Sequence, residues 1–210
     1  ADSGTGDYWV SPERVAVIGA GANPAAATGG QTYRLHDPYV LFVGYSWEQK
    51  GGPLLLEAFR LLRRAVPGAG LKIVGCTPPL EGPGIQVIGR LNPDSAGDRR
   101  RLAALYAGAR CLAILSTADA FPNVILEAGA HQVPVVALDR GSRSEIVIDG
   151  ETGLLVQDPS PDSVASALIR LLTDPALAQR MGQSAHSYIG ETFTWPRVAA
   201  RVVSAMEAGV

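Results

Sequence analysis

The sequence is poor in cysteine, in net charge and in long apolar runs, and each shortage excludes a class of protein. Its 210 residues include two cysteines and carry a formal net charge of −2. Cys76 and Cys111 lie inside apolar runs and lack the spacing of a metal or redox pair. We therefore expect buried free thiols in a reducing compartment rather than a disulfide.

The charged residues and histidines argue against several kinds of partner. No basic block stands out, and the run Arg99-Arg100-Arg101 fits a solvated helix face, so we expect no nucleic-acid partner. There is no Asp-x-Asp pair, and His36, His131 and His186 lie far apart, so we expect no metal. No apolar stretch is long enough to span a bilayer and no signal peptide is visible, so the expected location is cytoplasmic.

What the sequence does contain is an alternation of short β-branched runs with helical patterns. The runs are apolar on both faces, as in the strands of a parallel sheet that is covered on both sides. They predict strands at residues 15–18, 39–43, 71–74, 85–88, 112–115 and 133–137. Apolar residues at helical spacing predict helices within 55–66 and 102–109. The last third is predicted to be helical throughout, at 161–173, 175–189 and 195–207, with Thr194 as the final N-cap.

This alternation predicts an α/β fold. We expect a doubly wound, Rossmann-like parallel sheet of about six strands flanked by helices, with a helical C-terminal third. Residues 15–210 are expected to form one domain, and residues 1–14, which include a stretch rich in Gly, Ser and Asp, to be a linker or a cut end. In such sheets ligands bind beyond the carboxyl ends of the strands, so the loops after the strands are where a site is expected.

The first expected strand leads into a turn that matches a dinucleotide fingerprint only in part. Gly19 and Gly21 stand where its first two glycines would, but Pro24 occupies the place of the third, and no helical pattern follows. A tight turn is therefore favoured over the binding site of a nicotinamide-dependent oxidoreductase.

The strongest chemical pattern follows the expected strand at 112–115. Asp119 lies in the loop beyond that strand, Asn123 is positioned to cap the next helix, and Glu127 lies one turn further along the same helix face. A helix N-terminus suits a phosphate or sugar oxygens, and a carboxylate accepts hydrogen bonds from the two hydroxyls of a ribose. Considered alone, Asp119 is explained as a turn residue and Glu127 as a solvated helix residue. The two carboxylates together, at this spacing, favour a ligand-binding site.

The segment around these residues resembles the acidic-x7-Glu signature of the retaining, family-four type glycosyltransferases of GT-B fold. Residues 121–128 are close to the family's usual sequence motif. Two further segments also resemble motifs of the family: a glycine turn with a Lys-Gly pair within 42–52, and a closing motif within 144–156. The resemblance covers nearly the whole chain. Four positions depart from the family pattern. Asp119 stands where Glu is usual and Tyr45 where Arg is frequent, while Gln49 replaces a common basic residue and Gln132 a usual glycine.

The resemblance implies a role for each matched residue. Lys50 would neutralise the leaving diphosphate, Asp119 would hold the hydroxyls of the donor sugar, and Glu127 would hold the ribose. The glycines would let the chain pass close to the diphosphate, the start of the helix would offer N–H groups, and loop 89–91 would flank the base. The further residues expected to bind the donor are Gly44, Tyr45, Gly51, Arg90, Leu91, Phe121, Asn123 and Val124.

The implied reaction is the retaining, metal-independent transfer of a glycosyl group from a nucleoside-diphosphate sugar, with no cofactor. An N-terminal domain absent from this sequence would hold the acceptor, and the helix at 195–207 would cross back onto it. Any membrane contact would be made through that domain. Two alternatives stay open: a GT-B sugar-nucleotide epimerase or hydrolase, and a non-catalytic module that binds a nucleotide sugar.

Overall fold

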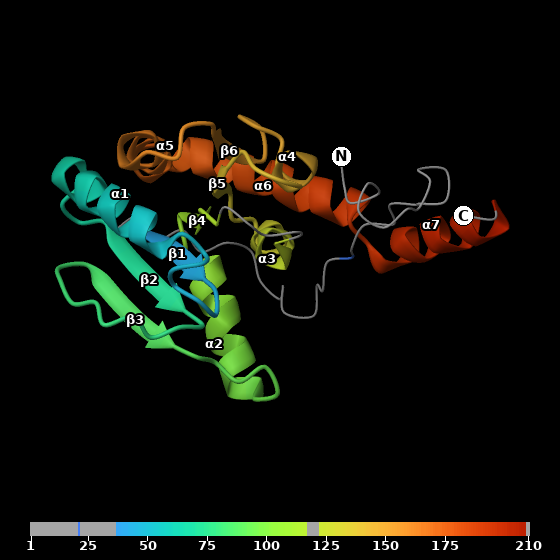
Figure 1. The fold of residues 1–210 in the computed structure, drawn as a ribbon, viewed down its shortest axis with the longest axis horizontal. Helices are drawn as coiled ribbons and strands as arrows, with labels where there is room; N and C mark the ends of the chain where they lie inside the picture. The colour runs from blue at the N-terminus through green and yellow to red at the C-terminus, as the bar shows by residue number, and fades with distance from the viewer. Residues whose placement is uncertain (1–20, 22–36, 117–121, 209–210) are drawn as a thin grey trace, which may run out of the picture.

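A six-stranded parallel sheet forms the centre of the molecule (Figure 1). The computed structural model describes residues 21, 37–116 and 122–208. The strands are β1 (Tyr39–Val43), β2 (Gly70–Val74), β3 (Ile85–Gly89), β4 (Cys111–Ile114), β5 (Val135–Leu138) and β6 (Gly153–Val156). Their order in the sheet is β3-β2-β1-β4-β5-β6, and every pairing is parallel.

The direction in which strands are added to the sheet reverses between β1 and β4. The chain builds β2 and β3 outward on one side of β1 and then returns to place β4 on the other side, where Val40 pairs with Cys111. At such a switch point the loops after the two neighbouring strands lead to opposite faces of the sheet. A crevice therefore opens between them at the carboxyl ends of the strands.

Helices cover both faces of the sheet. They are α1 (Gly52–Ala65), α2 (Ala96–Ala107), α3 (Asn123–Ala130), α4 (Arg143–Ile146), α5 (Pro161–Thr173), α6 (Pro175–Thr192) and α7 (Trp195–Glu207). Successive side chains of β1 point to opposite faces, as the pleat requires. Val40 and Phe42 belong to the apolar cluster under α1 and α5, whereas Tyr39 and Leu41 belong to the cluster under α2 and α3.

The C-terminal helix packs differently from the others. In Figure 1, α7 extends away from the body of the domain beyond the end of α6. Val198 is its one buried residue, while Trp195, Val203 and Met206 are exposed. Its first turn is nevertheless well formed, because the Thr194 hydroxyl accepts a hydrogen bond from the backbone N–H of Arg197 at 3.4 Å. Among the described residues, no helix is both long and apolar enough to cross a membrane.

The structure confirms the doubly wound sheet, the helical last third and the Thr194 cap. Five of the expected strands are present, with ends shifted by at most two residues; the one at 15–18 lies outside the described residues, as does the expected linker. β6 and the short α4 were not predicted as elements, since their residues lie in a segment interpreted only as a motif. Both cysteines are buried free thiols, as expected, and burial raises the pKa of Cys111 to about 12.

Candidate functional site

A cavity of about 430 Å³ lies at the carboxyl ends of β1 and β4, at the switch point of the sheet. This volume falls in the range of small-molecule sites. The loops after β1, β2 and β4 line it, together with the loop before α2 and the first turns of α2 and α3. The cavity brings together seven of the residues expected from the sequence, namely Gly44, Tyr45, Lys50, Leu91, Asn123, Val124 and Glu127.

The other expected residues lie elsewhere. Arg90 is exposed and does not line this cavity, although its neighbour Leu91 does. Gly51 also lies outside the lining, directly after Lys50. Asp119 and Phe121 lie outside the described residues. Within the part of the chain that the structure describes, no three His, Cys, Asp or Glu side chains gather as they would around a metal ion.

Two glycines place the Lys50 side chain at the cavity. Gly51 is the N-cap of α1 with a φ of 79°, and a Cβ at this position would collide with the backbone carbonyl of Leu115. Glycine adopts this left-handed conformation readily, and its small size lets the turn pass the end of β4. At Gly44 a Cβ would lie 2.9 Å from Cγ of Lys50, so a side chain there would displace the lysine. The turn therefore holds a half-buried cation on the cavity wall.

The N-terminus of α3 also faces the cavity. Asn123 and Val124 line it, and the N–H of Ile125 donates a hydrogen bond to the carbonyl of Pro122 at 2.9 Å. The two N–H groups before Ile125 have no carbonyl acceptor within the helix, so they carry the positive end of its dipole. The expectation that Asn123 caps α3 is wrong. Pro122 occupies the N-cap position, there is no side-chain cap, and Asn123 is already helical and exposed.

Glu127 lies one turn into α3, half-buried on the cavity wall. Its Oε2 accepts a hydrogen bond of 2.8 Å from the hydroxyl of Tyr106 in α2, a tyrosine that is 1% exposed. Burial raises the pKa of Glu127, and the bond from Tyr106 opposes that rise. Burial and the neighbouring carboxylate raise the pKa of Tyr106 well above its usual value, so the phenol keeps its proton and stays a donor. Glu127 is thus not a solvated helix residue.

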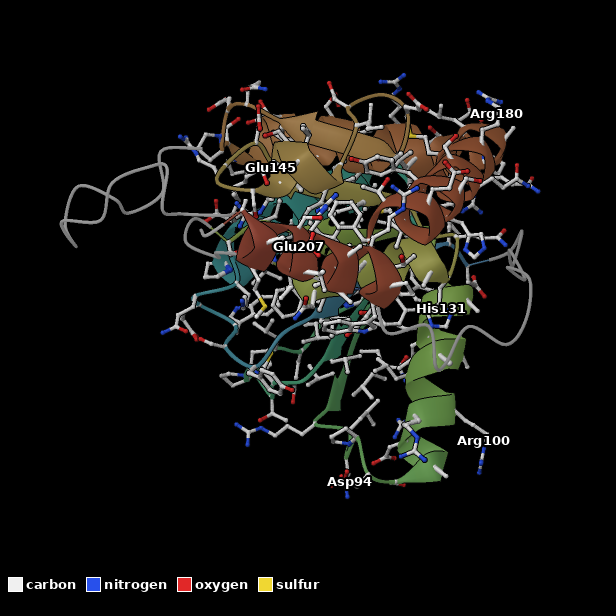
Figure 2. The ribbon with its side chains drawn as sticks, turned by 90° about the vertical axis from the view of Figure 1, so that its right-hand side faces the viewer. Asp94, Arg100, His131, Glu145, Arg180 and Glu207 are labelled. Carbon is white, nitrogen blue, oxygen red and sulfur yellow. The ribbon has the colours of Figure 1, made fainter. Side chains whose placement is uncertain are left out.

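The Tyr106 ring is itself held in place. It stacks on the ring of His131, with centroids 5.2 Å apart and planes 2° from parallel. Figure 2 shows His131 beside the end of α2. Burial lowers the pKa of His131, and the nearby His186 lowers it further, so this ring is neutral at neutral pH. Neither His131 nor Tyr106 lines the cavity. Tyr106 contacts Glu127 from outside the cavity lining, and His131 stacks on Tyr106.

The end of the cavity near β3 is bounded by a loop that α2 side chains fix in place. The carboxylate of Asp98 accepts a hydrogen bond from the N–H of Asn92 at 2.8 Å, and Arg99 donates to the carbonyl of Pro93 at 2.7 Å. Leu91 and Leu102 add apolar surface beside these polar groups. An apolar surface with a polar rim suits a planar ring that carries hydrogen-bonding edges.

Sequence analysis did not identify Arg143, a fully buried cation behind the cavity. Its Nη2 donates to the carbonyl oxygen of Ser116 at 2.8 Å and to the Ser116 hydroxyl at 2.7 Å, and its Nη1 donates to the carbonyl of Arg140 at 2.7 Å. Ser116 lines the cavity just after β4. Arginine is seldom fully buried in proteins, so the sequence carries no signal for this contact.

The chain is similar to known glycosyltransferases. The family model described as "Glycosyl transferases group 1" matches residues 37–174. The D-inositol 3-phosphate glycosyltransferase of Corynebacterium glutamicum (strain R) is 31% identical over 219 residues, which cover 94% of this chain and 52% of that protein. The chain therefore spans about half the length of the curated relatives it matches.

Two solved structures share the fold. One is the C-terminal domain of LpcC, a glycosyl transferase group 1 family protein from Francisella tularensis. It is 18% identical with a TM-score of 0.68, over 83% of this chain and 100% of that one. The other is HepE from Anabaena in complex with UDP and glucose. It is 19% identical with a TM-score of 0.70, over 82% of this chain and 49% of that one.

Proposed function

Because the chain belongs to the glycosyl transferases group 1 family, as a C-terminal domain of the GT-B, family-four type, we propose that its switch-point cavity binds a nucleoside-diphosphate sugar. One observation carries this proposal. Lys50, from the turn before α1, lines the same cavity as two features of α3, its N-terminus and the carboxylate of Glu127. A cation and helix N–H groups suit a diphosphate, and a carboxylate suits a ribose diol.

The two ends of the cavity suggest how the donor lies in it. Lys50 and the N–H groups of Asn123 and Val124 bind the diphosphate. Glu127 accepts hydrogen bonds from the ribose hydroxyls, and the base lies towards Leu91 and the loop that α2 fixes. This orientation directs the sugar beyond the diphosphate, where the sequence motif places Asp119. The complex of HepE with UDP and glucose, a protein of the same fold, supports a nucleotide in a site of this kind.

The proposed reaction is a retaining transfer that needs no metal. As the bond between the anomeric carbon and the phosphate oxygen breaks, its electron pair leaves with the diphosphate, which gains negative charge. Lys50 and the α3 dipole stabilise that charge more in the transition state than in the bound donor, which is what lowers a barrier. Asp119 holds the sugar hydroxyls while the acceptor oxygen bonds to the anomeric carbon and gives up its proton to the oxygen of the leaving diphosphate.

We propose that the acceptor is held by an N-terminal domain of the same enzyme. The curated relatives are about twice as long as this chain, and α7 exposes Trp195, Val203 and Met206 along one helix. A second domain packed against α7 would cover that apolar surface. Positioning the donor against an acceptor contributes roughly 7–11 kcal/mol to a barrier, so we expect the chain alone to bind donor without transferring sugar.

A thermal-shift experiment tests donor binding. UDP, GDP and ADP are compared with NAD, which contains an adenosine diphosphate unit but is the ligand of the dinucleotide fingerprint that this sequence matches only in part. At about a hundred times the dissociation constant, a bound nucleoside diphosphate stabilises the domain by about 2.7 kcal/mol. That gain corresponds to a rise in Tm of roughly 5–10 °C. Unchanged Tm with all three nucleoside diphosphates, or an equal rise with NAD, would contradict the proposal.

A further inference from the structure

Tyr106 links helices α2 and α3 through its side chain, a contact that no sequence pattern indicates. Its hydroxyl is buried, and a buried hydroxyl needs a hydrogen-bond partner. Here the partner is Oε2 of Glu127, on a different helix. Tyr39 offers a contrast within the same fold. It is also buried, and its hydroxyl donates at 2.6 Å to the backbone carbonyl of Leu105, so that bond joins β1 to α2 without reaching the cavity.

The bond from Tyr106 restricts what Glu127 can do. A glutamate side chain turns about three bonds, and fixing one of its two oxygens selects one orientation. The second oxygen can then accept a hydrogen bond from a ligand. The stack against His131 keeps the Tyr106 ring from turning away. The Tyr106 hydroxyl therefore contacts the Glu127 carboxylate, and that carboxylate lines the cavity. Tyr106 can affect a bound ligand only through Glu127.

We propose that Tyr106 is a positioning residue for nucleotide binding, one that orients the Glu127 carboxylate towards the ribose. This inference rests on the proposed function of the cavity. Tyr106 does not line the cavity, so its effect on a ligand must pass through Glu127. Because an ionised carboxylate accepts hydrogen bonds from both ribose hydroxyls, loss of the charge weakens the nucleotide contact.

The electrostatic surroundings support this role. Burial favours the neutral form of Glu127, and the hydrogen bond from Tyr106 opposes it. The titratable and charged groups near Glu127 among the described residues come from the turn before α1, from α2, from the end of α3 and from α6. They are Lys50, Asp98, Arg99, Tyr106, His131 and His186. Of these, Tyr106 is the one that donates directly to the carboxylate.

The test is Tyr106→Phe, which removes the hydroxyl and keeps the ring. Nucleoside diphosphate affinity, measured by calorimetry between pH 4.5 and 8, falls in the unmodified chain as Glu127 takes up a proton. In the variant the carboxylate loses its donor, so its pKa rises further and the fall begins at a higher pH than in the unmodified chain. The phosphate itself titrates near pH 6, but this change is common to both proteins and cancels in the ratio of their affinities.

Two controls separate positioning from loss of stability. Tyr39→Phe also removes a buried phenol that bonds to α2, so it lowers stability without moving the pH profile. The double variant Tyr106→Phe with Glu127→Gln shows whether the effect passes through Glu127. A glutamine does not titrate, so adding Tyr106→Phe to Glu127→Gln changes the affinity less than twofold and leaves it independent of this pKa.

The outcomes distinguish the two proposals. A shifted pH profile in Tyr106→Phe, absent in Tyr39→Phe and in the double variant, supports the positioning role. If Glu127→Gln weakens binding but Tyr106→Phe leaves both affinity and pH profile unchanged, the positioning role is overturned and the proposed function stands. If no nucleoside diphosphate binds the unmodified chain, both the positioning role and the proposed function are overturned. A ¹³C NMR titration of the glutamate carboxyls checks the coupling without ligand, since an unmoved Glu127 pKa in Tyr106→Phe would also overturn it.

Discussion

Replacing Lys50 tests the chemical identity of the ligand. Lys50 is the lysine that lines the cavity, half-buried, and the proposal gives it one task, the neutralisation of a diphosphate. Lys50→Ala should therefore weaken the binding of a nucleoside diphosphate and leave that of the free nucleoside nearly unchanged. The proposed base and ribose contacts, at Leu91 and Glu127, do not involve the lysine.

The size of the effect follows from the position of the side chain. A hydrogen bond to a charged group contributes about 1.5–3 kcal/mol. This is about a 10- to 150-fold change in dissociation constant. Lys50 is half-buried rather than enclosed, so salt screens part of the interaction, and the lower half of that range is expected at physiological ionic strength.

The assay uses an unusual property of the sequence, which has two lysines, Lys50 and Lys72. Lys72 lies on β2 with its ammonium 3.8 Å from the Tyr39 ring centroid, outside the cavity lining. Lys72→Ala is therefore the matched control in calorimetry. Reductive methylation with ¹³C formaldehyde labels both lysines for NMR, and the diphosphate should move the Lys50 signal alone. Equal losses for nucleoside and nucleoside diphosphate, or equal losses in the two lysine variants, would refute the phosphate role.

Three further predictions concern other positions. Glu127→Gln should weaken bare nucleoside diphosphates, whereas Asp119→Asn should spare them and weaken the intact sugar nucleotide; calorimetry showing equal losses for both ligands in Asp119→Asn would reverse the assignment. Gly51→Ala should lower the free energy of unfolding in urea by more than about 1 kcal/mol, because of its positive φ and the collision with the Leu115 carbonyl, and an unchanged midpoint would contradict this. Arg143→Met leaves two buried acceptors without their donor and should destabilise the domain by about 1–3 kcal/mol, with partial rescue in Arg143→Lys; a more stable Arg143→Met would show that the buried charge costs more than its bonds contribute.

Much of the fold could be predicted from local patterns because local physics produces them. A run such as 39–43 is apolar on both faces, and such a strand is stable only inside a covered parallel sheet. The Lys50-Gly51 pair marks a turn because a left-handed residue is needed there. The spacing from Asn123 to Glu127 is one helical turn, so both reach the same wall of the cavity. Each of these inferences depends on residues that are close in the sequence.

Local patterns failed where a distant contact decided the structure. β6 begins with a glycine in a segment interpreted only as a motif, and it forms because Val135 to Leu138 offer a partner edge. Asn123 has the side chain of an N-cap, yet the chain enters α3 one residue earlier, at Pro122. Arg90 belongs to the expected base-binding loop, yet it is exposed and does not line the cavity.

The sequence by itself determined which groups are available for chemistry: a cation after β1, a helix start after β4 and a carboxylate one turn later. The tertiary structure decided how they are combined. Parallel pairing of β1 with β4 brings the first two groups to one cavity. A hydrogen bond between α2 and α3 gives Glu127 its partner Tyr106, 21 residues away, and the return of the chain after β5 brings Arg143 to Ser116, 27 residues away. A buried polar group takes whatever partner the fold brings within reach, and no spacing in the sequence specifies that partner.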